Sequence, residues 1–130
     1  MGDSFKTNSP VRILLVDDEP DVRASIQLIL EHLRHQVTVA RDAEDALANF
    51  APGRFDLVIT DYSMPGMKGD ALAAKIRAVS PGQPIILKTA YFSSSGPNGN
   101  VTFPQVNLIL NVPFSIGELE EAIKQALGTD

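Results

Sequence analysis

The stretch Val11-Arg-Ile-Leu-Leu-Val-Asp-Asp-Glu-Pro20 is a short, nearly unbroken apolar run that ends on two adjacent acids. A run of this kind is typical of a strand that lies in a parallel sheet and is covered on both faces. Leu57–Thr60 repeats the pattern and ends on Asp61. The two runs predict a parallel sheet with acidic side chains gathered where its strands end.

Strands and helices are expected to alternate on either side of these runs. Further short strands are expected at Gln36–Ala40, Ile85–Leu87 and Val106–Leu110. Apolar spacing near 3.6 residues predicts helices from Pro20 to Leu33, around Ala43–Phe50, at Gly69–Val79 and after the capping box Ser115-Ile-Gly-Glu118. Because crossovers between parallel strands deposit their helices on the faces of the sheet, the predicted fold class is α/β, doubly wound.

One segment departs from the alternation. Within Tyr91–Gln105, where a helix is due, Ser93–Asn100 holds three Ser, two Gly, two Asn and a Pro. These residues favour turns over helix, so we expect a degraded fourth helix here, with at most a turn or two. The expected organisation is a flexible leader over residues 1–10 and one domain over residues 11–128.

Composition narrows the function classes. The 130 residues suit one domain, 44% are hydrophobic and 21% charged, and the net charge is −5. The 11 basic residues are outnumbered by 16 acidic ones, whereas a nucleic-acid-binding domain carries an excess of basic residues, so we expect no direct contact with nucleic acid. The absence of cysteine excludes disulfides and thiolate metal sites. No apolar run approaches the ~20 residues that cross a bilayer, so we expect no membrane contact and a cytoplasmic location.

Polar side chains at the strand ends carry the chemistry. Asp17 and Asp18 follow the first run, Asp61 follows the second, and Thr89 comes just after Ile85–Leu87. Carboxylates that converge on one edge repel one another unless a cation lies among them, and oxygen ligands suit a hard divalent ion. We therefore expect Mg²⁺ at this edge. Beside it, a carboxylate can act as a nucleophile toward a phosphoryl group.

The chain resembles the receiver (phosphoacceptor) domain of bacterial two-component response regulators, in an atypical form, over essentially Val11–Leu127. The resemblance rests on Leu15-Val-Asp-Asp-Glu-Pro20, Asp61-Tyr-Ser-Met-Pro-Gly-Met67 followed by Gly69, Thr89-Ala90 and Pro113-Phe114. It implies a flavodoxin-like five-stranded sheet of strand order 2-1-3-4-5. It also implies a signal-transduction partner on each side: a sensor histidine kinase or phosphotransfer protein, and a downstream effector protein.

The resemblance also assigns roles to individual residues. Asp61 is then the phosphoacceptor and Thr89 the switch hydroxyl. Asp18 is a direct Mg²⁺ ligand, Asp17 a ligand through water, and the backbone carbonyl of Ser63 the remaining protein ligand beside Asp61. On this interpretation the domain is not an enzyme, beyond accepting a phosphoryl group on itself.

Two positions depart from the family pattern. The family carries a lysine directly before the Pro-Phe pair, where this chain has Val112, and an aromatic residue three positions earlier, where it has Ile109. Valine can pair with neither an aspartate nor a phosphoryl oxygen. Lys88 is also unusual, because it is a charged residue within an otherwise apolar strand. It either extends along the strand end to solvent or reaches the acids and partly replaces the missing lysine.

Other interpretations stay open at this stage. The departures at Val112 and Ile109 also suit a degenerate receiver that acts as a protein-interaction module. A Mg²⁺-dependent phosphatase or phosphotransferase with Asp61 as nucleophile is less favoured, because no further general acid or base is visible. His32 and His35 are expected to be polar surface groups or solvated helix-end cations.

Overall fold

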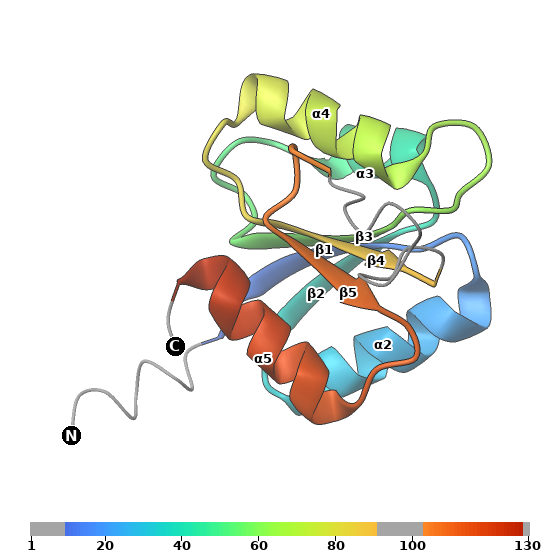
Figure 1. The fold of residues 1–130 in the computed structure, drawn as a ribbon, viewed down its shortest axis with the longest axis vertical. Coiled ribbons are helices and arrows are strands. Elements are labelled where there is room, and N and C mark those ends of the chain that lie inside the picture. Colours follow the sequence, from blue (N-terminus) through green and yellow to red (C-terminus); the bar gives the residue numbers. More distant parts are fainter. Residues whose placement is uncertain (1–9, 91–102, 129–130) are drawn as a thin grey trace, which may run out of the picture.

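A computed structural model describes residues 10–90 and 103–128. Within them, five parallel strands form one sheet in the order β2-β1-β3-β4-β5 (Figure 1). The strands are β1 (Arg12–Val16), β2 (Gln36–Ala40), β3 (Leu57–Asp61), β4 (Ile85–Thr89) and β5 (Leu108–Asn111). The predicted fold class and strand order are confirmed.

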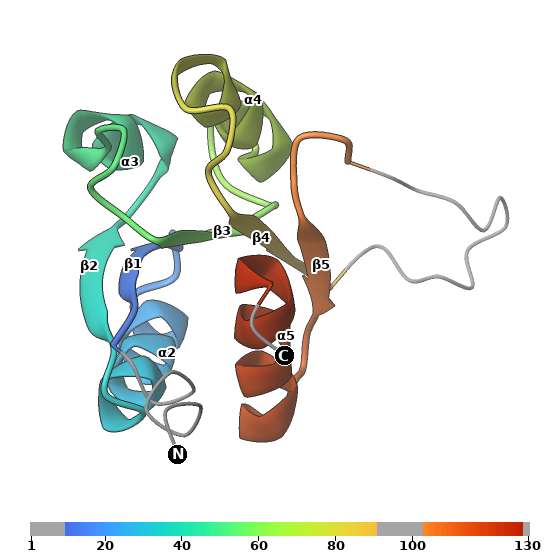
Figure 2. The ribbon, with the colours of Figure 1, turned by 90° about the vertical axis from the view of Figure 1, so that its left-hand side faces the viewer.

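Helices cover both faces of this sheet. They are α2 (Pro20–His32), α3 (Ala43–Asn49), α4 (Gly69–Val79) and α5 (Ile116–Leu127). Figures 1 and 2 show α2 and α5 on one face and α3 and α4 on the other. Two apolar cores result, because side chains on a strand alternate between faces. Ile13, Ile59 and Ile86 point into the α2/α5 core, whereas Leu14, Val58 and Ile85 point into the α3/α4 core.

The boundaries of the elements differ little from those expected. The predictions for Gln36–Ala40 and Gly69–Val79 are confirmed to the residue, and the capping box of α5 forms both of its hydrogen bonds. Strand β4 runs two residues past the expected Leu87, which brings Lys88 and Thr89 into the sheet.

Strand β5 begins at Leu108 rather than at the expected Val106. The Val106 N–H donates to the Phe103 carbonyl in a turn. Asn107 then contacts Ile85 twice, because its N–H donates to the Ile85 carbonyl and its side-chain oxygen accepts from the Ile85 N–H. The expected degraded helix falls mainly on residues 91–102, and the expected leader on residues 1–9. Both segments lie outside the described residues.

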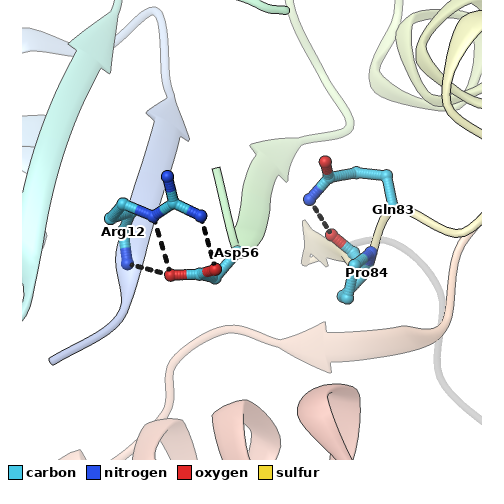
Figure 3. A network of polar contacts seen from close by, with 4 residues as sticks. All are labelled: Arg12, Asp56, Gln83 and Pro84. Atoms are coloured by element: carbon cyan, nitrogen blue, oxygen red, sulfur yellow. Dashed lines mark hydrogen bonds and ion pairs between the residues drawn. The ribbon is translucent and has the colours of Figure 1, made fainter. Parts of the chain in front are cut away.

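An ion pair joins two strands at the end of the sheet opposite the acids. Figure 3 shows Arg12 facing Asp56, with its Nε and terminal nitrogen 3.1 and 2.9 Å from the two carboxylate oxygens. The hydrogen bonds from Arg12 hold the pKa of Asp56 below its ordinary value. Nearby, the Gln83 side chain donates to the Pro84 carbonyl as β4 begins. These contacts lie at the amino ends of the strands, whereas the acids lie at the carboxyl ends.

His35 is not the solvated cation or surface group that the sequence suggested. Its Nδ1 accepts a hydrogen bond of 3.2 Å from the Val11 N–H, so this nitrogen carries no proton. Burial lowers the pKa of His35, and the nearby Glu120 carboxylate offsets only part of that effect. The ring thus supplies an acceptor to a backbone donor at the start of β1. His32, by contrast, is exposed at the end of α2, as expected.

None of the helices in the described ranges combines the length and the apolar character that a membrane span requires.

Candidate functional site at the carboxyl ends of the strands

Three carboxylates meet where β1 and β3 end. Asp17 and Asp18 directly follow the last residue of β1, and Asp61 is the last residue of β3, the neighbouring strand. One carboxylate oxygen from each of the three lies within 4.8 Å of the others. The predicted convergence of these acids is therefore confirmed.

The two carboxylates after β1 each keep an oxygen without a hydrogen bond. Asp17 is fully buried, and its Oδ1 accepts from the Glu19 N–H at 2.9 Å. No hydrogen bond reaches the buried Oδ2 of Asp17 or Oδ1 of Asp18. Buried charged oxygens need a partner, and hard oxygen ligands favour Mg²⁺. The donor set therefore fits a divalent cation.

Lys88 supplies a positive charge to this cluster. Its Nζ lies 2.9 Å from Asp17 Oδ2 and 3.7 Å from Asp61 Oδ1. Its side chain is only 7% exposed, so the alternative in which it extends to solvent is wrong. Of the two interpretations left open by the sequence, the structure shows the one that brings Lys88 to the acids.

The register of the sheet explains how a residue of β4 reaches β1. Lys88 pairs with Asp61 across β3 and β4, and it follows Ile86 on the face covered by α2 and α5. On the other side, Lys88 pairs with Leu110 of β5. Val112 comes two residues after Leu110 and continues the same face. The position that the family fills with lysine and the position that carries lysine here thus share one face of the sheet.

A cleft of about 320 Å³ lies beside Lys88 on this face. Its walls include Val22 and Ile26 of α2 and the segment Val112, Pro113 and Phe114, and the Val112–Pro113 peptide bond is cis. Val112 contributes an apolar side chain to this wall, where the family carries a lysine. Neither the cleft nor its relation to Lys88 was predicted, because it joins segments that are far apart in sequence.

Asp61 has a pKa well above its ordinary value. Burial raises its pKa to about 6, the charge of Lys88 opposes the shift, and the charges of Asp17 and Asp18 add to it. The Ser63 N–H donates to the carboxylate and also favours its charged form. A cation at this edge lowers the energy of the charged form further.

The remaining predicted residues lie around Asp61. Ser63 is two residues beyond it, in the loop that follows β3. Thr89 ends β4, is buried, and accepts at its carbonyl from the Val112 N–H. Since side chains alternate along β4, Thr89 points to the α3/α4 face while Lys88 points to the α2/α5 face, as expected. Ile109 is half-buried and pairs with Leu87.

Two further features of the site were not predicted. The Tyr62 ring, directly after Asp61, lies against Phe103 with 5.4 Å between ring centroids. Gly69 begins α4 so close to β3 that an added Cβ would collide with the Asp61 carbonyl and lie 2.8 Å from Leu87 Cδ1. A glycine three residues after the turn-rich string Ser63-Met-Pro-Gly66 was a usable signal for such a close approach.

The fold and the site define the class of this protein. The chain belongs to the response regulator receiver domain family, whose model matches residues 13–124.

Two proteins similar in sequence to this chain are transcriptional regulators. The chain is 36% identical over 110 residues to the probable transcriptional regulatory protein TcrX of Mycobacterium tuberculosis, a match to 85% of this chain and 47% of that protein. It is 34% identical over 122 residues to the transcriptional regulatory protein GlrR of Escherichia coli, a match to 93% of this chain and 27% of that protein. The chain therefore matches half or less of the length of these relatives.

Solved structures agree with this assignment. A response regulator receiver domain protein from Clostridium thermocellum superposes with a TM-score of 0.81 at 26% identity, with 91% of this chain and 94% of that chain covered. The response regulator TrrA of Thermotoga maritima, solved in complex with Mg²⁺ and BeF, gives a TM-score of 0.78 at 34% identity over 90% of this chain and 99% of that chain.

Proposed function

We propose that this domain is a phosphoacceptor that takes a phosphoryl group onto Asp61 from a histidine kinase or phosphotransfer protein, with Mg²⁺, and relays the change to an effector protein. The observation that carries the proposal is the buried ammonium of Lys88, which lies 2.9 Å from Asp17 and 3.7 Å from Asp61. The domain accepts the group on itself and does not turn over a separate substrate.

The acceptor chemistry follows from the position of Asp61. Its carboxylate attacks phosphorus, a P–O bond forms, and the bond from phosphorus to the donor nitrogen breaks as that nitrogen takes up a proton. Asp61 is half-buried at a strand end, which leaves a face from which a donor can approach. A carboxylate with a pKa near 6 is ionised at neutral pH, as a nucleophile must be.

The metal would be held by Asp18 and Asp61, by Asp17 through water, and by the Ser63 carbonyl. When bound, Mg²⁺ neutralises charge on the oxygens of the transferred group. Support comes from the buried Asp18 Oδ1, which no hydrogen bond reaches, from the three converging carboxylates, and from TrrA, which was solved with Mg²⁺ and BeF. Thr89, buried at the end of β4, would donate its hydroxyl to a phosphoryl oxygen and report the modification to the α3/α4 face.

Lys88 takes the place of the lysine that the family carries before its Pro-Phe pair. An ammonium 3.7 Å from Asp61 Oδ1 is close enough to stabilise a phosphoryl group attached there. The same observation counts against a degenerate interaction module, because a domain that had lost its switch would have no need to bury this charge. Retention of the cation on a new strand indicates a working acceptor.

The partners follow from the family and from charge. The named relatives are transcriptional regulatory proteins, and a net charge of −5 gives this chain itself no electrostatic attraction to nucleic acid. We infer that its direct contacts are with proteins of the cytoplasm, the donor on one side and an effector on the other.

Intact-protein mass spectrometry tests the proposal. The protein is incubated with a small acyl phosphate, with Mg²⁺ or with a chelator. The expected result is a labile gain of one phosphoryl group that needs Mg²⁺ and is lost in Asp61→Asn. No gain in the wild type, or an equal gain in Asp61→Asn, would overturn the proposal.

A further inference from the structure

We propose that Lys88 is a built-in competitor of the metal: its ammonium occupies Asp17 in the resting domain, and Mg²⁺ binds only by displacing it. The inference rests on the proposed function and adds to it a control of metal affinity by one residue of this chain. It follows from which carboxylate the lysine contacts, since Nζ lies nearer to Asp17 than to the acceptor Asp61.

The contact with Asp17 occupies an oxygen suited to metal coordination. Asp17 Oδ1 is already committed to the Glu19 N–H, and Oδ2 receives no hydrogen bond. The Lys88 ammonium, 2.9 Å from Oδ2, is therefore what balances this fully buried charge. A divalent ion among the same carboxylates would have to share Asp17 with Lys88 or replace it.

Electrostatics makes sharing unfavourable. An ammonium and a divalent cation within a few ångströms of the same carboxylates repel each other, and burial weakens the screening by water. Removing the ammonium leaves three carboxylates with no internal counter-ion. That change must increase the affinity of the cluster for an external cation.

The fold also provides a place for the displaced side chain. The cleft of about 320 Å³ next to Lys88 has Val112 in its wall, where a lysine would otherwise fill space. Asp21 of α2 lines the same cleft and offers a second carboxylate. Lys88 can therefore leave Asp17 while its charge stays near a carboxylate, either that of Asp61, 3.7 Å from Nζ in the resting domain, or that of Asp21.

Calorimetric titration with Mg²⁺ alone tests the inference, with wild type, Lys88→Met and Lys75→Met compared. Lys75 is an exposed lysine of α4, so its variant matches the change in net charge away from the cluster. We expect Lys88→Met to bind Mg²⁺ on the order of tenfold more tightly than the wild type, and Lys75→Met to bind like the wild type. Equal or weaker binding in Lys88→Met would overturn the inference while leaving the proposed function intact.

A second measurement uses the unaltered protein, so it does not depend on the variant folding. The NMR signals of the Lys88 side chain are followed as Mg²⁺ is added. They should shift in step with occupancy, while those of Lys75 stay constant. Invariant Lys88 signals during saturable Mg²⁺ binding would overturn the displacement, and no Mg²⁺ binding in any form would overturn the proposed function together with it.

Discussion

Asp61 and Lys88 stand opposite each other in the sheet, paired in register across β3 and β4, with Oδ1 and Nζ 3.7 Å apart. The proposed acceptor and the ammonium nearest to it therefore lie on adjacent strands. In the usual family pattern the lysine comes after the last strand, at the position of Val112. Both positions lie on the α2/α5 face and line the same cleft, so we expect a lysine at either one to reach the acids.

Moving the lysine back should preserve acceptor activity. Lys88→Met is expected to slow phosphorylation by an acyl phosphate about 100-fold, because a fixed cation near the transferred oxygens is lost. The double variant Lys88→Val, Val112→Lys should recover most of that loss. Rates are measured by mass spectrometry of samples quenched at successive times, at saturating Mg²⁺, so that altered metal affinity does not contribute.

The double variant shows whether a lysine at position 112 can replace Lys88 in phosphorylation. If it remains as slow as Lys88→Met although it is folded by circular dichroism, the two lysine positions are not equivalent. Lys88 would then have a different role, and the proposal that it takes the place of the family's lysine would be wrong.

Asp18→Asn should weaken Mg²⁺ binding by about tenfold or more, because it replaces a charged ligand oxygen by a neutral one. Glu121→Gln is the control, since it removes one negative charge from an exposed position of α5, outside both the three-carboxylate cluster and the cleft beside Lys88. Calorimetry at fixed ionic strength measures both. Equal affinities in the wild type and Asp18→Asn would contradict the ligand assignment.

Gly69→Ala should destabilise the domain by about 2 kcal/mol, because the added methyl group meets the Asp61 carbonyl and Leu87 Cδ1 in a packed site. Gly117→Ala in α5 serves as the control. There the only neighbour near the new Cβ is Ser115 Oγ at 3.8 Å, so alanine should raise stability by about 0.5–1 kcal/mol through its helix propensity. Urea unfolding measures both, and equal effects would contradict the close approach of α4 to β3.

His35 should make stability depend on pH. Its pKa is lowered in the folded protein, so below its ordinary value of 6.5 the unfolded chain binds a proton that the folded chain resists. Stability should therefore fall as pH decreases through about 6.5, and level off once the folded site is protonated. His35→Gln should remove this component, whereas His32→Gln should not. Identical pH profiles for the wild type and His35→Gln would contradict the neutral, half-buried ring of His35.

The sequence was sufficient to predict the sheet, its helices and the convergence of Asp17, Asp18 and Asp61. Buried parallel strands are marked by continuous apolar runs, and their carboxyl ends share one edge whatever the details of packing. Lys88 could be singled out as an anomaly for the same reason, because a charge inside an apolar strand requires a partner.

What the sequence could not supply was the choice among tertiary partners. Whether Lys88 reached solvent or Asp17 depended on the register of β4 against β3 and on the exposure of the strand end. The role of the His35 ring as a hydrogen-bond acceptor depended on a backbone donor at Val11, 24 residues away. The cleft beside Val112 depended on how α2 packs against the segment before α5.

The most direct test of the central claim is to locate the phosphoryl group by chemical trapping. After reaction with an acyl phosphate and Mg²⁺, borohydride reduces an aspartyl phosphate to homoserine and releases phosphate, and peptide sequencing by mass spectrometry finds the altered residue. We expect homoserine at position 61 alone, both in the wild type and in the double variant Lys88→Val, Val112→Lys. Homoserine at Asp17 or Asp18, or at no position in protein that has bound Mg²⁺, would contradict it.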